Sequence, residues 1–234
     1  MTGASALHRL RNSLANSAGT IVFGMEDGTV SIFGLIFGVA ATTTSTATVL
    51  IAGASGAVAA AVSMMAGAYL DVETTRDRIN ANRALLQSDV TRDSAAVAAS
   101  LSNRLAKAGL TPQQSAALAG AVQNNRQAFA GLLLALQGVP DAPQNPWEQA
   151  LWMLLADFFA AAVPILPFVF APIPQARIIS GVVTLALLVV LGIGRARIAK
   201  RSIVRTVAET VSIGIAAALA GVIIGVLIDH GFRH

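Results

Sequence analysis

Five long blocks of apolar residues constrain this chain more than any other feature of its sequence. They cover residues 20–41, 49–70, 147–170, 178–193 and 206–228. A helix needs about 20 residues to cross the hydrocarbon core of a bilayer, at a rise of about 1.5 Å per residue. Hydrophobic residues make up 55% of the chain and charged residues only 12%, whereas soluble domains usually have roughly one-quarter charged residues. We therefore predict an all-α integral membrane protein with five transmembrane helices.

The predicted domain organisation follows from a polar segment, residues 71–147, between the second and third apolar blocks. From Asp71 to Glu148 the sequence has seven acidic and seven basic residues and no apolar run long enough to span a bilayer. This segment is therefore predicted to be a water-facing insert. Residues 1–70 then hold the N-terminal segment and the first two spans, and residues 148–234 hold the last three spans.

Three helices are predicted within the insert. Apolar residues at spacings of three, four and seven indicate one long amphipathic helix from Ile79 to about Gly109. Thr111 and Gln114 have the spacing of a capping box, which starts a second helix. A third helix is expected over residues 127–137, before a Gly and Pro segment that cannot continue it.

Basic residues in the short loops predict the orientation in the membrane. Five of them follow the fourth block: Arg195, Arg197, Lys200, Arg201 and Arg205. The N-terminal segment adds Arg9 and Arg11, whereas the opposite side has only Arg177 and the tail residue Arg233. Because basic loops stay on the cytosolic side, we expect the N-terminus and the insert in the cytosol. The C-terminus is expected across the membrane.

Four acidic residues fall inside apolar spans, where an ionised side chain costs at least about 2.5 kcal/mol on insertion scales. Glu26 and Asp27 are adjacent in the first span with no nearby base in the sequence, so they would repel unless a proton or a cation is shared. Asp157 lies in the third span and is either a satisfied hydrogen-bonding group or part of a path. Glu209, near the start of the fifth span, is either a solvated acid in a first helical turn or a path residue.

Methionine sulfur is the other candidate metal ligand. Met64 lies in the second span, where a methionine packs more often than it ligates. A thioether beside a carboxylate would nevertheless suit a borderline-soft cation such as Fe²⁺ better than Mg²⁺ or Ca²⁺. The histidines His8, His230 and His234 lie near the termini and form no metal-binding pattern, and cysteine is absent.

Catalytic motifs are missing from the sequence. It has no phosphate-binding glycine loop with a lysine, no His-Glu-x-x-His helix motif and no Gly-x-Ser-x-Gly elbow. We therefore expect transport or scaffolding and no enzyme activity. The net charge of +4 resides largely in loops beside apolar blocks, where membrane topology explains it, so a nucleic-acid partner is not expected.

Three stretches resemble the vacuolar iron transporter family. They are Val-Phe-Gly-Met-Glu-Asp-Gly-Thr-Val-Ser at residues 22–31, residues 50–69, and Val-Pro-Ile-Leu-Pro-Phe at residues 163–168. The resemblance implies a five-span homodimer with the conduction path between protomers. It also implies export of Fe²⁺ or Mn²⁺ from the cytosol in exchange for protons, across a cytoplasmic membrane in bacterial members. Membrane lipid, a second copy and the transported metal are then the partners, with no tightly bound cofactor.

The resemblance also assigns roles to residues. Asp27 would be the principal cation ligand and Met64 the soft ligand, with Glu26 as second carboxylate or proton carrier. In place of the family's second-span glutamate this chain has Ala68, and Asp71 follows three residues later, nearer water. The other candidates for a proton or cation path are Asp157, Glu209 and Asp71.

The insert departs further from the family pattern. Transporting members carry many glutamates there that collect metal, whereas this insert has only Glu73 and Glu148. Hard cations need several oxygen anions held together, so a metal-concentrating role is not expected here. These departures favour a rival hypothesis, in which the chain has lost transport and serves as a structural or accessory membrane subunit, or moves another solute.

Overall fold

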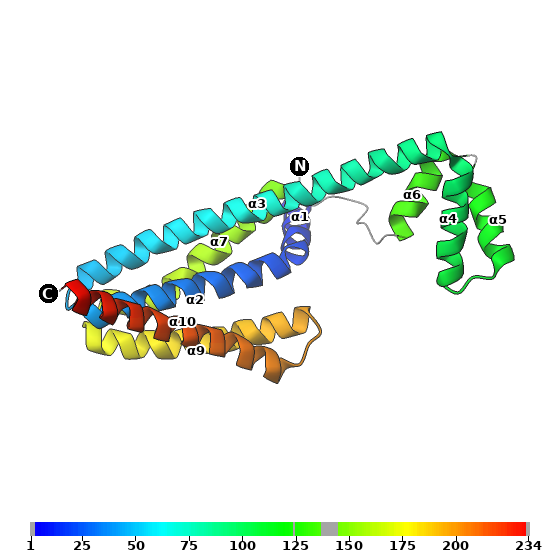
Figure 1. Cartoon of the computed structure of the whole chain (residues 1–234). Helices are drawn as coiled ribbons and strands as arrows, with labels where there is room; N and C mark the ends of the chain where they lie inside the picture. Colours follow the sequence, from blue (N-terminus) through cyan, green and yellow to red (C-terminus); the bar gives the residue numbers. More distant parts are fainter. Residues whose placement is uncertain (1–2, 124, 137–144, 233–234) are drawn as a thin grey trace. The chain divides into compact units, whose positions relative to one another are not determined.

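The computed structural model describes residues 3–123, 125–136 and 145–232 and is helical throughout, with no strand among these residues (Figure 1). The ten helices are α1 (Gly3–Asn16), α2 (Ala18–Thr42), α3 (Thr46–Arg92), α4 (Ser94–Lys107), α5 (Pro112–Gln123), α6 (Arg126–Leu136), α7 (Pro146–Ile165), α8 (Pro167–Phe170), α9 (Ile173–Ile198) and α10 (Ile203–Phe232). Gln137, at the end of the predicted third insert helix, and the terminal Arg233 and His234 lie outside the described residues.

Five helical segments are long and apolar enough to cross a membrane. They are α2, α3, the segment Pro146–Phe170 that joins α7 to α8, α9, and Ile203–Gly231 of α10. The prediction of an all-α membrane protein with five spans is confirmed. The last two helices are longer than predicted, because α9 continues to Ile198 and α10 begins at Ile203. Arg195, Arg197 and Arg205 therefore lie in helices, and the predicted basic loop is wrong in its extent.

The chain divides into two compact units. One is formed by Met1–Leu70 with Pro146–His234, and the other by Asp71–Asn145. We call them the membrane unit and the insert unit. Helix α3 contributes residues to both, since it continues without a break from the second span to Arg92.

The insert unit has its own apolar core, formed by Val90, Leu101, Leu105, Ala119, Phe129 and Leu133. The predicted capping box is present: Gln114 Oε1 accepts from the Thr111 backbone N–H at 3.0 Å, and Thr111 Oγ1 accepts from the Gln114 N–H at 3.3 Å. The single long helix predicted to Gly109 is wrong, however. Asp93 leaves helical geometry with φ −150°, and its side chain caps α4 by accepting from the Ala96 N–H. A capping aspartate thus ended a helix that apolar spacing alone would have continued.

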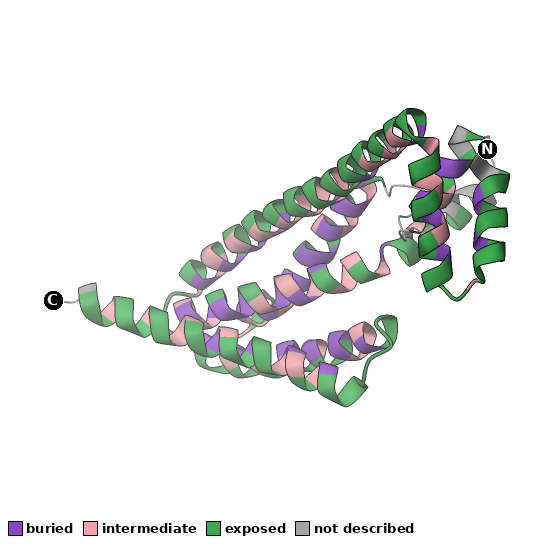
Figure 2. Ribbon diagram, turned by 45° about the vertical axis from the view of Figure 1, so that its right-hand side comes forward, coloured by how far each residue is buried: buried purple, intermediate pink, exposed green. Residues whose placement is uncertain are grey.

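Within the membrane unit, α2 lies at the centre and contacts α7, α9 and α10. Its Gly24 faces Met153 of α7, and its Gly28 faces Asp157 one turn further along. Residue numbers therefore rise together, so α2 and α7 run in the same direction. Figure 2 shows buried positions along α2, whereas the visible side of α3 is mostly exposed.

The other neighbours of α2 fit the same topology. Val22 contacts Gly194 and Phe37 contacts Gly181, so α9 runs opposite to α2. The α10 residues that contact α2 have numbers that rise along α2, so α10 runs in the same direction as α2. The α3 residues that contact α2 have numbers that fall along α2, so α3 runs in the opposite direction. Directions therefore alternate along the five spans, as five successive membrane crossings require.

The third span breaks at its prolines. Helix α7 contains Pro164 and ends at Ile165, and α8 begins at Pro167. The backbone oxygen of Pro164 accepts a hydrogen bond from Ser180 Oγ of α9 at 2.8 Å. Ser180 thereby satisfies an acceptor beside the break, where helix-breaking residues free backbone groups in a membrane.

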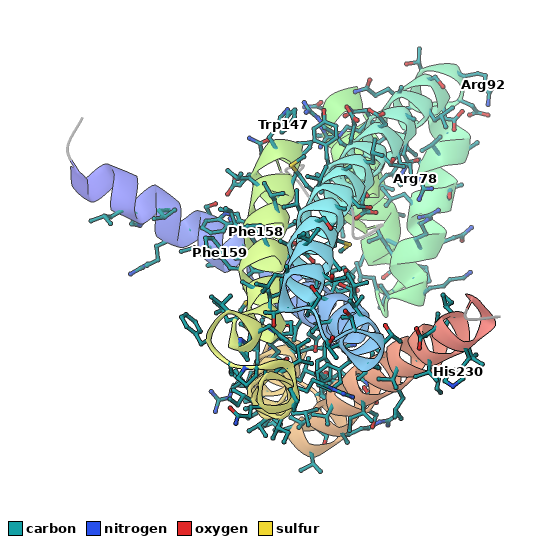
Figure 3. The ribbon with its side chains drawn as sticks, turned by 90° about the vertical axis from the view of Figure 1, so that its left-hand side faces the viewer. Arg78, Arg92, Trp147, Phe158, Phe159 and His230 are labelled. Atoms are coloured by element: carbon teal, nitrogen blue, oxygen red, sulfur yellow. The ribbon has the colours of Figure 1, made fainter. Side chains whose placement is uncertain are left out.

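Aromatic rings on α7 mark its surface. The Trp147 ring packs against Tyr69 of α3 with centroids 4.9 Å apart, at the end of the span where an interfacial indole is expected. Phe158 and Phe159 are 41% and 66% exposed, and Figure 3 labels both on the ribbon of α7. Exposed phenylalanines in mid-span suit a helix face in contact with lipid.

Glycines bring the backbones of α2 and α10 into contact. A Cβ at Gly38 would lie 2.7 Å from the backbone oxygen of Gly221, and one at Gly221 would collide with the backbone oxygen of Gly34. A backbone atom cannot rotate away as a side chain can. The glycines of α2 thus allow close helix packing within the chain.

Gly221→Ala is expected to lower the free energy of unfolding by about 1–3 kcal/mol, the usual cost of overpacking. Thermal unfolding of the purified protein in detergent measures the loss. Gly231→Ala is the matched control in the same helix, because a Cβ there meets no atom within 4 Å. Equal stability of the two variants would contradict the close α2–α10 contact.

Candidate functional site

A cavity of about 460 Å³ lies between α2, α9 and α10, and both Glu26 and Asp27 line it. Glu26 is eight residues after the start of α2, which places the pair about 12 Å along the helix axis. The remaining wall is mainly apolar, with Val22, Phe23 and Ile213 among its residues. The two acids therefore lie well inside the span and beside open space.

Glu26 has two partners from other helices. Its Oε2 lies 3.3 Å from Arg195 Nη1 of α9, and its Oε1 accepts a hydrogen bond from Thr210 Oγ1 of α10 at 2.7 Å. The expectation of two acids without a nearby base is wrong. Because α9 is longer than predicted and antiparallel to α2, its last turn brings Arg195 level with Glu26. The ion pair balances the charge of a carboxylate whose side chain is only 11% exposed.

The surroundings of the Asp27 carboxylate differ from those of Glu26. It is half-buried and faces the cavity. Its backbone oxygen accepts from Ser31 Oγ at 2.7 Å, but within the described residues its carboxylate has no hydrogen-bond donor or ion-pair partner. Of the adjacent acids, Asp27 is thus the one whose charge is available to a solute in the cavity.

Asp157 of α7 is completely buried, and both of its carboxylate oxygens are without a hydrogen-bond partner among the described residues. It faces Gly28, the residue after Asp27. The sequence left two alternatives for Asp157, and the structure does not support the one in which its side chain is a satisfied hydrogen-bonding group. Native proteins rarely leave a buried polar group in this state.

The other predicted path residues lie elsewhere. Glu209 is paired with Arg201 at 3.6 Å and Arg205 at 3.0 Å, and its side chain is 36% exposed. This arrangement fits the interpretation of a solvated acid in the first turns of α10. Asp71 is exposed and belongs to the insert unit.

The structure does not bring Met64 to the acids. Met64 is half-buried on α3 and is not among the residues that line the cavity. Another methionine, Met153 of α7, has its sulfur against Gly24, one turn before Asp157 on the same helix face. The spacing of four between Met153 and Asp157 was readable in the sequence. The contacts of Arg195 and Thr210 with Glu26 could not be predicted from the sequence, because they depend on how α9 and α10 pack against α2.

Dense metal-binding clusters are absent from the described part of the chain, which contains no group of three or more His, Cys, Asp or Glu suited to a metal. The donors are instead few and mixed: the carboxylates of Glu26 and Asp27 line the cavity, and the carboxylate of Asp157 and the thioether of Met153 lie against Gly28 and Gly24 of the same helix. Such a set suits weak, reversible binding of a borderline-soft cation more than a permanent structural metal.

Comparison with known proteins gives one consistent result. A model of the VIT family matches residues 18–226. "Vacuolar iron transporter 1" of Eucalyptus grandis is 27% identical over 176 residues, which cover 74% of this chain and 70% of that protein. The protein of the same name from Tulipa gesneriana is 28% identical over 180 residues, or 76% of this chain and 73% of that protein. "Vacuolar iron transporter 1" of Arabidopsis thaliana is 27% identical, with 74% and 70% covered. The range matched by the family model includes the cavity and all three acids.

Proposed function

Because this chain belongs to the VIT family, we propose that it transports a divalent metal cation, Fe²⁺ or Mn²⁺, out of the cytosol in exchange for protons. The observation that carries the proposal is Asp27, a carboxylate without a partner among the described residues, which faces a cavity within a membrane span. An ionisable side chain in this position is expensive, and such residues usually lie on ion pathways.

We assign roles to the residues as follows. Asp27 is the principal cation ligand, and Met64 is the soft ligand by its resemblance to the family pattern. Glu26, whose charge Arg195 balances, is the second carboxylate at the cavity and the candidate carrier of the exchanged proton. A cation that enters the cavity would compete with Arg195 for this negative charge.

A homodimer in a bacterial cytoplasmic membrane is part of the same proposal. The span of α3 leaves large apolar side chains exposed, with Ile51 at 69%, Val58 at 51% and Val62 at 49%. A second copy placed against this face would bring α3, and Met64 with it, to a shared path. The N-terminus and the insert would face the cytosol, as the basic residues predict.

Flux measurements test the proposal. Purified protein in liposomes should carry Fe²⁺ and Mn²⁺ at rates that rise when a proton gradient of the opposite direction is imposed. Empty liposomes under the same gradient are the control. Flux no greater than this control, for both metals and both gradient directions, would rule out the transport function.

One observation favours the rival function of an accessory subunit without transport. The family's second-span glutamate is replaced by Ala68, and the insert has few glutamates. Calorimetric titration separates the two functions, because a transporter must bind its cation. Saturable heat on addition of Mn²⁺ supports transport, and its absence supports the accessory role.

A further inference from the structure

Asp157 is an acid in a membrane span to which the proposed function gives no role. Its side chain is 0% exposed, and neither oxygen has a hydrogen-bond partner among the described residues. Glu26, by contrast, has both Arg195 and Thr210. Burying a carboxylate without hydrogen-bond donors is costly. A folded protein that retains such a carboxylate therefore needs a bound cation or a proton at that place.

The packing of α7 against α2 brings Asp157 to Asp27. A Cβ at Gly28 would lie 2.9 Å from Asp157 Oδ1, so only a glycine at this position leaves room for the carboxylate. Asp27 is the residue before Gly28 in α2. Two acids on parallel helices thus lie at adjacent positions of the α2–α7 contact, and Arg195 is already engaged by Glu26. Their mutual repulsion is relieved by a cation between them.

The surroundings indicate which cation. Asp27 opens to the cavity of about 460 Å³, which gives a route for a solute. Met153 Sδ lies against Gly24, one helical turn before Asp157. Carboxylate oxygen with a nearby thioether favours a borderline-soft divalent ion over Mg²⁺ or Ca²⁺.

We propose that Asp157 of α7 is a second cation ligand, which together with Asp27 of α2 forms a two-carboxylate site for the transported divalent metal. This inference rests on the proposed transport function. It adds a ligand from the third span and makes α7 part of the metal path. Water would fill the coordination positions that the protein leaves open.

Binding of Mn²⁺, followed by electron paramagnetic resonance on the full-length protein in detergent, tests the site. Asp157→Asn should weaken Mn²⁺ binding at least about tenfold, and Asp27→Asn should do the same. Glu148→Gln removes one acid from the first turn of the same helix and should leave the affinity within about twofold. Asp157→Ser is a second neutral variant with a smaller side chain. Weaker Mn²⁺ binding in both variants would show that the loss comes from the missing charge and not from the packing of asparagine.

Thermal unfolding supplies a second measurement. Without metal, Asp157→Asn should melt at the same temperature as the unmodified protein or higher, because it removes a buried charge without a partner. Saturating Mn²⁺ should raise the melting temperature of the unmodified protein and not that of the variant.

The outcomes are distinguishable. Retention of Mn²⁺ affinity within twofold in both Asp157 variants, with loss in Asp27→Asn, would overturn this inference and leave the proposed function intact. Absence of saturable Mn²⁺ binding in the unmodified protein would remove both. Loss of binding in the Asp157 variants, with their melting temperatures preserved, supports the two-carboxylate site.

Discussion

Asp27→Asn is expected to reduce Fe²⁺ flux into proteoliposomes by at least about a hundredfold, the upper end of the effects seen when even outer contacts of a metal site are lost. The physical reason is charge. Asp27 is the carboxylate at the cavity that lacks a partner among the described residues, and asparagine keeps its shape but not its charge. Within a low-dielectric span, a divalent cation that loses one of its few compensating anions is bound much more weakly.

The matched control is Asp89→Asn, which removes an acid of the insert unit whose side chain is 46% exposed and paired with Arg92. Its flux should equal that of the unmodified protein. Asp27→Asn should also remain folded, because it removes a costly charge from a span, and gel filtration in detergent checks this. Full flux in a folded Asp27→Asn protein would show that the cation passes elsewhere.

The membrane architecture could be predicted from the sequence because its signals are local. Apolar length identifies a span whatever lies beside it, so five spans were found without any knowledge of packing. The same holds for the capping box of Thr111 and Gln114, whose partners are three residues apart. The break at Asp93 was missed although its signal was also local, because apolar spacing on both sides of it continued the helical pattern.

The site could be predicted only in part, because its contacts join residues far apart in the chain. Glu26 and Arg195 are 169 residues apart, and the pair forms only because α9 extends by a further turn antiparallel to α2. Asp157 was found as a buried acid, but its lack of a donor depends on which side chains surround it. Met64 remains a prediction, since its proposed role involves a second copy of the chain.

Arg195→Ala is expected to lower the free energy of unfolding by about 3 kcal/mol, the lower end of the cost of breaking a buried ion pair. The side chain of Glu26 is 11% exposed and that of Arg195 is 39% exposed, so solvent screens the pair on one side only. Removing the guanidinium leaves a buried carboxylate whose one hydrogen-bond donor among the described residues is Thr210. Denaturant unfolding in detergent measures the loss, and Arg197→Ala, an exposed base in the same helical turn, should change the stability by less than about 0.5 kcal/mol.

Glu26→Gln in the Arg195→Ala background should recover most of this stability, because no uncompensated charge is then buried. If both variants are equally unstable, the loss comes from the packing of the arginine stem and not from the charge of Glu26. The double variant also separates structure from transport, since it folds with Asp27 intact. Its Fe²⁺ flux should no longer respond to a proton gradient if Glu26 carries the proton, whereas a normal response would place the exchanged proton on another group.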